Sequence, residues 1–398
     1  MKKVYLNIPK LLLAGLLLAS VPLATQGQTD QHGQITVIVP IPGTVPPIPV
    51  SLDGFTGDVA AVLNFDLYVQ GFKVVPASEA QYRISGSNAG NVAGSLTDIA
   101  GHKMLFSRTY SGASERRQAH AFADDIVGNI LKLPPIGGTK IAYKAQSPAG
   151  GSGEIFVADF DGFDAQPVTT DNAIVAKPAW MPHHLALYYT SYARSNPDIF
   201  FHSLSSGERH VIAGYSGLNT SASVSPDGSK VAMILSKSGS PNVWVCNADG
   251  SNLRQVTTGV EDSSPCWSPD GQWICFASKI NARRVLAKVP AGGGAVQRIP
   301  TSGVANPTEP EWSPDGKWIA FTSQMGDFSI CVMSADGTVA PQALVSGQNP
   351  SWSPNSRTLV FNHGPAGHQT LSVLDVLTKQ YKDCHRATGS DSQPAWAR

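Results

Sequence analysis

Apolar positions in the larger part of the chain occur in short runs separated by clusters of turn residues, and this pattern predicts strands joined by tight turns. In Pro265–Phe276 (PCWSPDGQWICF), two apolar runs flank Pro269-Asp270-Gly271. Proline presets φ, aspartate bonds its own backbone and glycine accepts positive φ, so this tripeptide is typical of a turn between antiparallel strands. A third apolar run follows in each unit, at Ile155–Val157, Ile199–Phe201, Val243–Val245, Val285–Leu286, Ile330–Val332 and Leu371–Val373.

The strand–turn–strand segment is repeated at a regular interval. Pro310–Phe321 (PEWSPDGKWIAF) is the clearest second copy, and weaker copies extend the series of anchor positions to Trp180, Val224, Trp267, Trp312, Trp352 and Trp396. Successive anchors are 40 to 45 residues apart, which is the repeat length of a β-propeller blade. A short fourth strand, such as Arg254–Thr257, makes four antiparallel strands per unit, as in one blade.

The two ends of the repeat region predict how the ring closes. Trp396 has no second strand after it, whereas Ile141–Tyr143 matches a second strand and has no anchor before it. The C-terminal strand is therefore expected to complete the blade that begins at residue 141 and to remove an open sheet edge. The prediction is a mainly β fold in which residues 136–398 form a closed six-bladed propeller; an open solenoid would not explain the complementary ends.

Residues 28–135 lack the repeat, and their pattern predicts a small α/β domain. Apolar residues at helical spacing predict helices over 57–70 and 114–131, with Ser114 as the N-cap of the second helix. The proline-rich run 40–49 is expected to be extended and non-helical. Strands or extended chain are expected at 35–39, 72–75, 82–84 and 103–106, and residues 134–138 are the predicted linker.

Residues 1–27 have the pattern of a secretory signal peptide. Basic residues precede Leu11–Ala19, an apolar run, and small residues at Ala24 and Gly27 offer cleavage positions. This run is too short to span a bilayer as a helix, and no other stretch is long and apolar enough. We therefore expect export to the periplasm with cleavage near Ala24–Gly27, rather than membrane insertion; a buried N-terminal helix is the alternative.

Composition narrows the functional classes. The 398 residues include 38 Gly and 29 Pro, about 17% of the chain, which disfavours long helices and coiled coils. The formal net charge is zero, so the chain has no excess of basic residues to bind phosphates, and nucleic-acid binding is not expected. The five cysteines lack CxxC spacing; Cys266 and Cys275 flank one turn and could pair, but buried free thiols are the favoured interpretation.

The sequence shows little catalytic or metal-binding chemistry. Gly214–Leu218 lacks the last glycine of a nucleophile elbow, and Gly292–Gly294 has no following helix or lysine to bind phosphate. The adjacent His183 and His184 stand where other units carry a turn, and neighbouring side chains that point apart suit a single metal poorly. We expect no enzymatic activity, no cofactor and no resident metal.

With these motifs in place, the order of segments resembles the TolB family, the periplasmic component of the Tol–Pal system. The shared features are a signal peptide, a small α/β domain and a six-bladed ring of strict or weaker Trp-Ser-Pro-Asp-Gly repeats, closed by Pro394-Ala395-Trp396. Ser221–Met233 (SASVSPDGSKVAM) is similar to the family's third-blade segment and Ile141–Tyr143 to its domain junction. Leu218–Ala222 keeps only the asparagine of the family's His-Asn-Gly-Ala-Pro.

The resemblance implies a scaffold without enzymatic activity. Such a protein would bind the peptidoglycan-associated lipoprotein Pal through one face of the propeller and a TolA-like inner-membrane protein through its N-terminal region, in support of outer-membrane integrity and constriction. A second hypothesis is an exported propeller that shares only the repeat and acts as a carbohydrate-binding module or hydrolase accessory domain. We expect a monomer.

The resemblance also implies that partner contacts lie in the loops before the Pro-x-Trp strands, at roughly 213–221, 257–264, 300–309, 346–350 and 388–392. The predicted contact residues are Asn219, Thr220, Ser221, Glu261, Asp262, Ser263, Glu309 and Asp391. The carboxylates in or beside these loops, with Lys177 as the main counter-charge, suggest an acidic mouth that would favour a basic partner segment or Ca²⁺. These carboxylates are Glu261, Asp262, Glu309, Glu311 and Asp391; solvated loop charges are the alternative.

Overall fold

The computed structural model describes residues 4–5, 28–29, 35–37, 40–146, 151–259, 261–385 and 389–398. The predicted signal-peptide segment Leu11–Ala19 and its cleavage positions lie outside the described residues. The chain divides into two compact units, Met1–Gly137 and Gly138–Arg398. Within the described ranges, neither helix is long and apolar enough to cross a bilayer.

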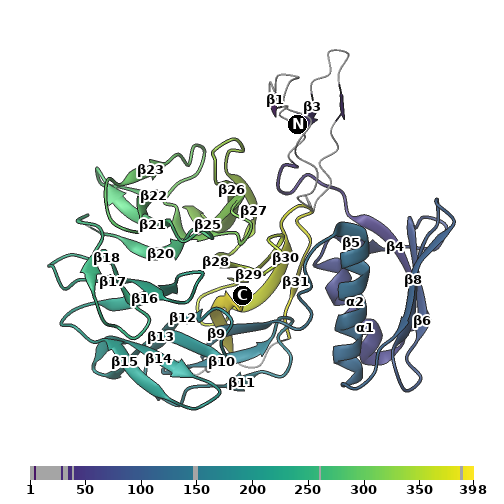
Figure 1. Cartoon of the computed structure of the whole chain (residues 1–398), viewed down its shortest axis with the longest axis horizontal. Coiled ribbons are helices and arrows are strands. Elements are labelled where there is room, and N and C mark those ends of the chain that lie inside the picture. Colours follow the sequence, from purple (N-terminus) through teal and green to yellow (C-terminus); the bar gives the residue numbers. More distant parts are fainter. Residues whose placement is uncertain are drawn as a thin grey trace, which may run out of the picture. The chain divides into compact units, whose positions relative to one another are not determined.

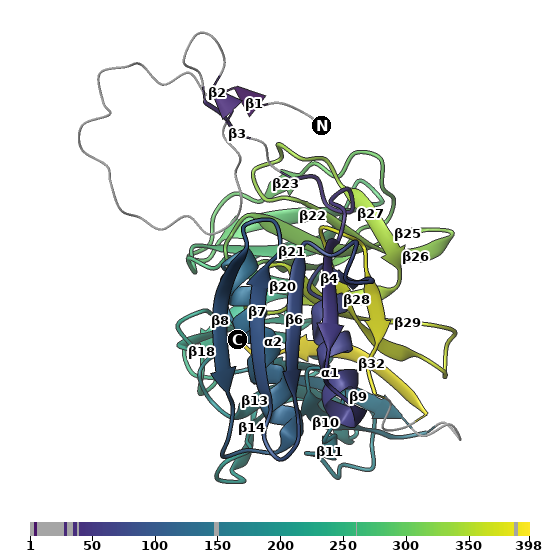
Figure 2. The ribbon, with the colours of Figure 1, turned by 90° about the vertical axis from the view of Figure 1, so that its right-hand side faces the viewer.

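The first unit contains a five-stranded mixed sheet with two helices on one face, and Figure 2 shows β8, β7, β6 and β4 side by side in front of those helices. The strand order is β5-β4-β6-β7-β8; β4 is parallel to both neighbours and the other pairs are antiparallel. The elements are β4 (Ile48–Asp53), α1 (Gly57–Tyr68), β5 (Phe72–Val74), β6 (Tyr82–Ser87), β7 (Ala93–Asp98), β8 (Lys103–Thr109) and α2 (Glu115–Leu131). Strands β1 (Val4–Tyr5), β2 (Gln28–Thr29) and β3 (Ile35–Val37) form a separate small sheet.

Both helices form where the apolar spacing predicts them. Ser114 caps α2 by accepting a hydrogen bond from the Arg117 N–H (3.3 Å), as expected for an N-cap serine. Leu63 of α1 and Phe122 of α2 are fully buried in one apolar cluster with residues of the sheet. Packing of these two faces, rather than helix propensity alone, stabilises the small domain.

Two strands of this sheet, β4 and β7, were not predicted from the sequence. The proline-rich run ends in β4, which pairs in parallel on both sides although it contains Pro49. Pro49 is tolerated near the start of the strand because its carbonyl still accepts a bond from Gln81 N–H (2.9 Å). Strand β7 was missed because AGSLTD carries little apolar alternation.

The second unit is a six-bladed β-propeller, and the predicted fold class is confirmed (Figure 1). Six antiparallel four-stranded sheets each use one sequence repeat. Blade 1 contains β12 (Val175–Trp180), β13 (Ala186–Arg194), β14 (Asn196–Ser203) and β15 (Arg209–Ala213); blade 2 contains β16 (Asn219–Val224), β17 (Lys230–Leu235), β18 (Asn242–Asn247) and β19 (Arg254–Gln255); blade 3 contains β20 (Ser263–Trp267), β21 (Trp273–Ile280), β22 (Arg283–Pro290) and β23 (Gln297–Ile299). Blade 4 contains β24 (Thr308–Trp312), β25 (Trp318–Met325), β26 (Asp327–Ser334) and β27 (Gln342–Ser346); blade 5 contains β28 (Gln348–Trp352), β29 (Thr358–His363), β30 (Thr370–Asp375) and β31 (Tyr381–Asp383).

Blade 6 closes the ring with strands from both ends of the repeat region. Its order is β11-β10-β9-β32, built from β9 (Lys140–Gln146), β10 (Gly153–Asp159), β11 (Gln166–Pro167) and the C-terminal β32 (Ser390–Trp396). The register places Trp396 opposite Ile141. The predicted closure by the C-terminal strand is confirmed, and it leaves β9 with a hydrogen-bonded neighbour on each side.

In blade 2, the second and third strands are largely buried on both faces. In β17 (KVAMIL) every residue after Lys230 is buried, and four of the six residues of β18 are buried. Blades pack face to face, so side chains that point to either side of these strands enter an apolar layer. This packing accounts for continuous apolar runs where a one-sided sheet would show alternation.

Candidate functional site

The six inner strands surround a central channel. They are the first strands of the blades, and each contacts the next around the ring, from β12 through β16, β20, β24 and β28 to β32 and back to β12. We call the end at which these strands begin the mouth end, and the opposite end, which carries the Ser-Pro-Asp-Gly turns, the turn end. The predicted contact loops connect the outer strand of one blade to the inner strand of the next, at the mouth end.

Each inner strand contains one bulge, and a non-glycine residue with positive φ lies at each bulge. The partner register shifts at the same place in all six strands. The bulge residues are Lys177, Ser221, Ser264, Glu309, Asn349 and Gln393, with φ between 50° and 56°. Five of them precede the Pro of Pro-x-Trp, and Ser221 precedes Ala222. All six line the channel, so the repeat places one side chain per blade at the same depth.

Two of these bulge residues form an ion pair across the channel. Lys177 belongs to blade 1 and Glu309 to blade 4, which are opposite each other in a ring of six. Lys177 Nζ lies 3.0 Å from Glu309 Oε1 and 2.6 Å from Asn349 Oδ1. Burial alone would raise the pKa of Glu309, but the Lys177 ammonium, the Thr322 hydroxyl and the Asn349 N–H outweigh it and lower the pKa.

A second carboxylate that lines the channel, Glu311, is paired at the turn end. Glu311 forms an ion pair with Arg398, and its Oε1 accepts hydrogen bonds from Ser351 Oγ and Trp352 N (both 3.2 Å). Burial raises the pKa of Glu311, and the Arg398 guanidinium opposes this effect. The pair joins blade 4 to the end of the closing strand β32.

Three of the predicted contact residues are buried. Asn219 is fully buried, and its side chain accepts a bond from Tyr215 N (3.0 Å) and donates to Pro197 O and Tyr215 O (2.9 and 2.7 Å). Asp391 is 3% exposed. Asp262 is 2% exposed and accepts bonds from Thr257 and Ser278.

Burial raises the pKa of Asp262, while its two hydroxyl donors oppose this effect. Asp262 therefore joins the outer strand region of blade 2 to the second strand of blade 3, and Asn219 holds the loop before β16. In this conformation these buried side chains shape the mouth loops from beneath and do not face solvent.

The remaining predicted residues are partly exposed. Thr220 accepts a bond from Thr190 Oγ1 (3.1 Å), and Ser263 Oγ accepts one from Arg284 (3.3 Å). The Glu261 side chain is 42% exposed and lies 3.0 Å from both Lys279 Nζ and Arg284 Nη2. Hydrogen bonding to Lys279, together with the charges of both cations, lowers the pKa of Glu261.

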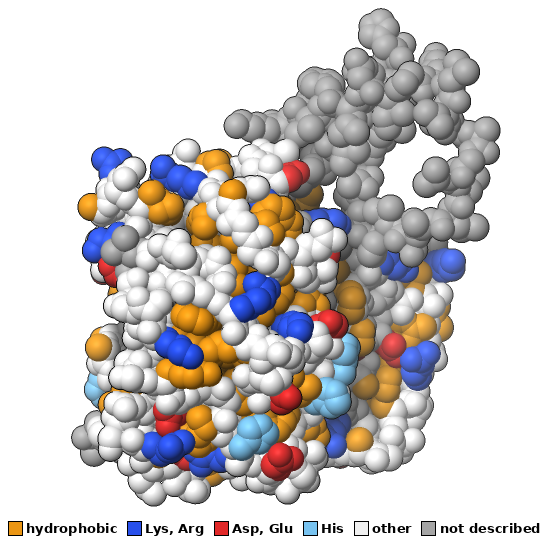
Figure 3. Space-filling view, turned by 60° about the vertical axis from the view of Figure 1, so that its left-hand side comes forward, with side chains coloured by type: hydrophobic (Ala, Val, Ile, Leu, Met, Phe, Trp, Pro, Cys, Tyr) orange, Lys and Arg blue, Asp and Glu red, His pale blue; other side chains and the backbone are white. Residues whose placement is uncertain are grey.

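The predicted acidic mouth is therefore wrong as an electrostatic description. Glu261, Glu309 and Glu311 are each paired with a cation, and the buried Asp262 is hydrogen-bonded to hydroxyl groups. The sequence identified the carboxylates but not Lys279 and Arg284, which lie on a hairpin outside the predicted loops. On the side of the molecule in Figure 3, acidic side chains are scattered singly among hydrophobic and basic ones.

A cavity of about 360 Å³ opens from the bulge residues toward the turn end. Its wall includes Pro182, Pro226, Pro269 and Pro314 from the turns of four blades, and its polar groups include Lys177 and Arg398. Its volume lies within the range of small-molecule pockets. This cavity was not predicted. Proline recurs at two fixed positions in the repeats, and this recurrence is the sequence feature that could have indicated the apolar cavity wall.

The Ser-Pro-Asp-Gly turns share one hydrogen-bond pattern. In blade 2, Ser225 Oγ donates to Asp227 Oδ1 (2.6 Å) and accepts from Lys230 N (2.9 Å), while Asp227 accepts from Ser229 N (3.0 Å). The same contacts recur at Ser268 and Ser313. At Ser353 the second contact does not recur, because Ser353 Oγ donates to Asn355 Oδ1 (2.6 Å) but Thr358 N donates to Asn355 Oδ1 instead of to Ser353 Oγ. The repeated aspartate is thus a turn residue and offers no ligand set.

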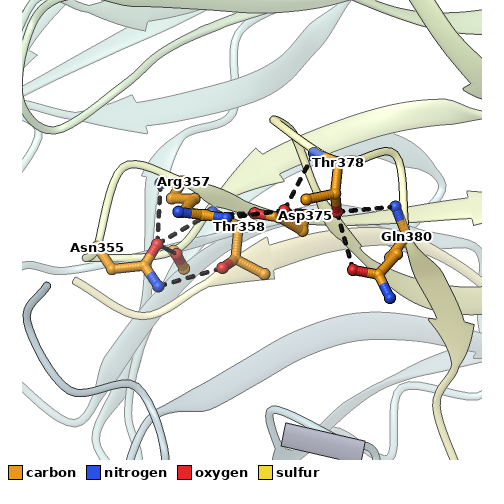
Figure 4. A network of polar contacts seen from close by, with 7 residues as sticks. Asn355, Arg357, Thr358, Asp375, Thr378 and Gln380 are labelled. Carbon is orange, nitrogen blue, oxygen red and sulfur yellow. Dashed lines mark hydrogen bonds and ion pairs between the residues drawn. The ribbon is translucent and has the colours of Figure 1, made fainter. Parts of the chain in front are cut away.

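Blade 5 departs from this pattern, and Figure 4 shows the polar network that accompanies the change. Asn355 stands where the other turns have aspartate, and its Oδ1 accepts bonds from Arg357 N and Thr358 N (2.9 and 3.0 Å). The buried Arg357 guanidinium forms two bonds with the fully buried Asp375 carboxylate (2.5 and 3.1 Å). Thr378 donates a further bond to Asp375 (2.6 Å), so the buried pair is well satisfied and joins adjacent strands.

Three anchor tryptophans connect neighbouring blades through their indole N–H. Trp180, Trp267 and Trp352 donate to main-chain carbonyls on the preceding inner strand, at Ala395, Ser223 and Glu311 (3.0 to 3.1 Å). This contact explains why the anchor is tryptophan, which combines a large apolar surface with a donor.

The motifs with possible chemistry lie in turns and cores. His183 and His184 occupy an exposed turn, and Gly292–Gly294 lies in the loop between β22 and β23. All five cysteines are buried free thiols, and Cys266 lies opposite Cys275 in the register. Burial raises the pKa of Cys246 to about 12 and that of Cys331 to about 11, which disfavours the reactive thiolate.

The fold and the channel define a class: a six-bladed propeller of Pro-Asp-Gly repeats, closed by its C-terminal strand and preceded by a small α/β domain. The family described as TolB beta propeller domain (PD40) matches residues 136–398. The chain therefore belongs to the TolB β-propeller family.

Individual relatives carry the same name. A Tol-Pal system protein TolB from Alcanivorax borkumensis is 29% identical over 234 residues, covering 50% of this chain and 54% of the relative. One from Anaeromyxobacter dehalogenans is 32% identical over 164 residues, covering 39% and 36%. The chain thus spans about half or less of the length of these curated relatives in the aligned regions.

Solved structures show the same fold. The crystal structure of TolB from Acinetobacter baumannii has a TM-score of 0.79 at 22% identity, covering 90% of this chain and 98% of that one. A putative TolB from Agrobacterium tumefaciens has a TM-score of 0.51 at 18% identity, covering 64% and 91%. At this identity the similarity concerns the fold, including the order of the small domain and the propeller.

Proposed function

We propose that this protein is a periplasmic TolB-like scaffold of a Tol–Pal system that binds a Pal-like lipoprotein at the mouth end of its propeller. Membership of the TolB β-propeller family across residues 136–398 carries the proposal, together with the curated relatives named Tol-Pal system protein TolB. The protein would act by docking, without bond chemistry, and would support outer-membrane integrity and constriction.

The construction of the mouth end supports a docking role. Asn219 and Asp262 hold two of its loops through buried hydrogen bonds. A surface whose loops are held in place before binding loses little conformational entropy on association. Thr220, Ser221, Glu261 and Ser263 remain the candidate contact residues above this framework, and Asn219, Asp262 and Asp391 become positioning residues.

A direct binding measurement tests the proposal. The exported chain is titrated with the soluble, lipid-free domain of the Pal-like lipoprotein from the same organism, by calorimetry or interferometry. Thr258→Trp adds bulk to an exposed mouth loop, whereas Gln272→Trp adds it to an exposed turn-end position in the next blade. We expect binding that T258W weakens at least tenfold and Q272W leaves unchanged. No binding by the wild-type chain would refute the proposal, and an effect of Q272W alone would move the site to the turn end.

The N-terminal unit is the proposed contact for a TolA-like inner-membrane protein. Val74 and Met104, on the edge strands β5 and β8, are 41% and 59% exposed. Exposed apolar side chains on sheet edges are suited to pairing with another chain. We expect Met104→Glu to abolish capture of the TolA-like periplasmic domain and to leave Pal binding intact; unchanged capture would exclude this edge.

The cavity at the turn end favours one specific alternative. Its wall of prolines and its polar groups, which include Lys177 and Arg398, would suit a carbohydrate or another small ligand, as in the hypothesis of a carbohydrate-binding module. A thermal-shift screen with sugars would support this alternative if a saccharide stabilised the protein and Pro269→Trp removed the effect. No stabilisation by any sugar would count against it.

A further inference from the structure

The mouth end carries a local excess of basic side chains on blades 2 and 3. Lys279 and Arg284 are cross-strand partners at the tip of the β21–β22 hairpin, and Ile280 lies opposite Arg283. Asn281 and Ala282 both have positive φ (50° and 61°), so the hairpin ends in a tight two-residue turn. This geometry places three cations and an apolar side chain on one short projection.

Glu261 holds two of these cations together. Two positive side chains directly opposite each other would normally destabilise a strand pair. Glu261 lies 3.0 Å from each of them and offsets the repulsion. One carboxylate therefore serves two cations, and Lys279, with its side chain 46% exposed, keeps access to solvent.

Arg283 is not paired in this way. It is exposed, and among the described residues it makes no ion pair. Ile280 beside it is 37% exposed. An arginine that is not satisfied by the protein, next to an apolar side chain, has the composition of an interface contact.

The patch continues onto blade 2. Lys237 is exposed, and its Nζ lies 3.9 Å from the centre of the Tyr215 ring. The hairpin of Lys237 contacts the loop of Glu261 directly, because Ser240 Oγ donates to Gly259 O (3.2 Å) and Asp262 N donates to Pro241 O (3.0 Å). We call Lys237, Lys279, Ile280, Arg283 and Arg284 the basic patch.

We propose that the basic patch is the docking surface for an acidic protein segment, one that presents at least two carboxylates beside an apolar side chain. The inference rests on the proposed docking function and deepens it by naming the partner's chemistry. The patch contains four cations, and the partly exposed Glu261 carboxylate pairs with two of them, so charge complementarity selects an anionic partner. Guanidinium groups bind carboxylates in a planar, bidentate geometry, and Ile280 would supply apolar contact. This is the opposite of the basic partner that the carboxylates alone suggested.

Binding of the Pal-like soluble domain to charge variants tests the inference. Arg283→Glu reverses a charge that is not used in the fold, and Lys317→Glu is the matched control, since Lys317 is 59% exposed beside a turn-end loop. We expect R283E to weaken binding about tenfold, K317E to leave it unchanged, and wild-type affinity to fall as salt increases.

These binding measurements distinguish failure of the basic-patch inference from failure of the proposed docking function. Binding that R283E does not weaken would overturn the basic patch and leave the docking function standing. Absence of any binding to the Pal-like domain would refute that function, and a second probe then decides the patch. That probe is a fluorescent peptide of alternating Glu and Leu, titrated into wild type, R283E and K317E at low salt.

Peptide binding that only R283E loses supports the patch, and equal or absent binding in all three overturns it. Binding to phosphatidylglycerol vesicles is measured in parallel, to test whether the patch recognises an anionic lipid surface instead of a protein. Binding to these vesicles without binding to the peptide would overturn the assignment to a protein partner.

Discussion

The ammonium of Lys177 and the carboxylate of Glu309 meet across the propeller channel, with Nζ and Oε1 3.0 Å apart and the two residues 132 positions apart in the sequence. They belong to opposite blades, and both stand at the bulge that every inner strand carries. The pair therefore links parts of the ring that share no sheet.

Removing one member of this pair should destabilise the propeller more than removing both. Lys177→Met leaves the Glu309 carboxylate half-buried without its cation, and we expect a loss of about 1–3 kcal/mol in the free energy of unfolding. Lys177→Met combined with Glu309→Gln should recover part of that loss. Urea unfolding at pH 7 of both single variants, the double variant and wild type measures the coupling energy. Strict additivity would show that the pair contributes nothing.

The Lys177 ammonium should also take the place that a divalent cation would have between the oxygens of Glu309 and Asn349. Its Nζ lies between Glu309 Oε1 and Asn349 Oδ1, the kind of oxygen ligands that Ca²⁺ would require. We expect millimolar CaCl₂ to leave the melting temperature of the wild-type protein unchanged and to stabilise Lys177→Ala. Equal stabilisation of both proteins would place a calcium site elsewhere, and no effect on either would show that these oxygens are too few.

The small domain should show a pH dependence that originates at Asp124. Burial raises the pKa of Asp124 to about 6, against the partly compensating hydrogen bonds from Ile136 N and Gly137 N. The folded state therefore binds this proton more tightly than the unfolded chain, whose carboxyl has a pKa of 3.8. The resulting stability is fully present below about pH 4 and is lost as the pH rises through about 6.

Relative to Asp124→Asn, wild type should lose on the order of 2 kcal/mol between pH 4 and pH 7. Thermal unfolding of both proteins at the two pH values measures this difference, and ¹³C NMR of the Asp124 carboxyl measures its pKa directly. A pKa near 4 would contradict the prediction.

Closure of the ring should depend on Trp396 more than on Arg398. The Trp396 ring is 3% exposed, stacks on Phe160 with centroids 5.8 Å apart, and donates to Thr139 Oγ1 (2.8 Å). Trp396→Ala should cost about 3–5 kcal/mol, as for other buried tryptophans. Arg398→Ala, which removes the ion pair with the largely buried Glu311 and a bond to Trp312 O, should cost less, about 1–3 kcal/mol. Comparable losses in both variants would indicate that the terminal ion pair, and not the packed strand, holds the ring closed.

Much of the propeller was predictable because its determinants are local and repeated. Pro269-Asp270-Gly271 is a turn by its own backbone preferences, and the same chemistry recurs at 40 to 45 residue intervals. Strand β4 was not predicted because the prolines in 40–49 disfavour a regular strand pattern. In the fold, β4 is held by hydrogen bonds from two neighbouring strands, so it does not need a strong local pattern.

The candidate site was predictable only in its loops. Asn219, the first residue of β16, and Asp262, in the loop before β20, lie at the mouth end, but their burial depends on how adjacent blades pack. The acidic mouth was wrong because the Lys279 and Arg284 cations that pair with Glu261 come from a hairpin at a different place in the repeat. Counting carboxylates along the sequence could not reveal these pairings.

The number of blades, the turns between their strands and the closure of the ring by the C-terminal strand can be read from the amino-acid sequence, because each follows from short-range backbone chemistry repeated with a fixed period. Which charges remain available to a partner depends on the folded arrangement. It paired Lys177 with Glu309 across the channel, placed Glu261 between two cations and left Arg283 exposed. Those outcomes depend on through-space distances between residues of different strands and blades, and Coulomb interactions follow such distances and not position along the chain.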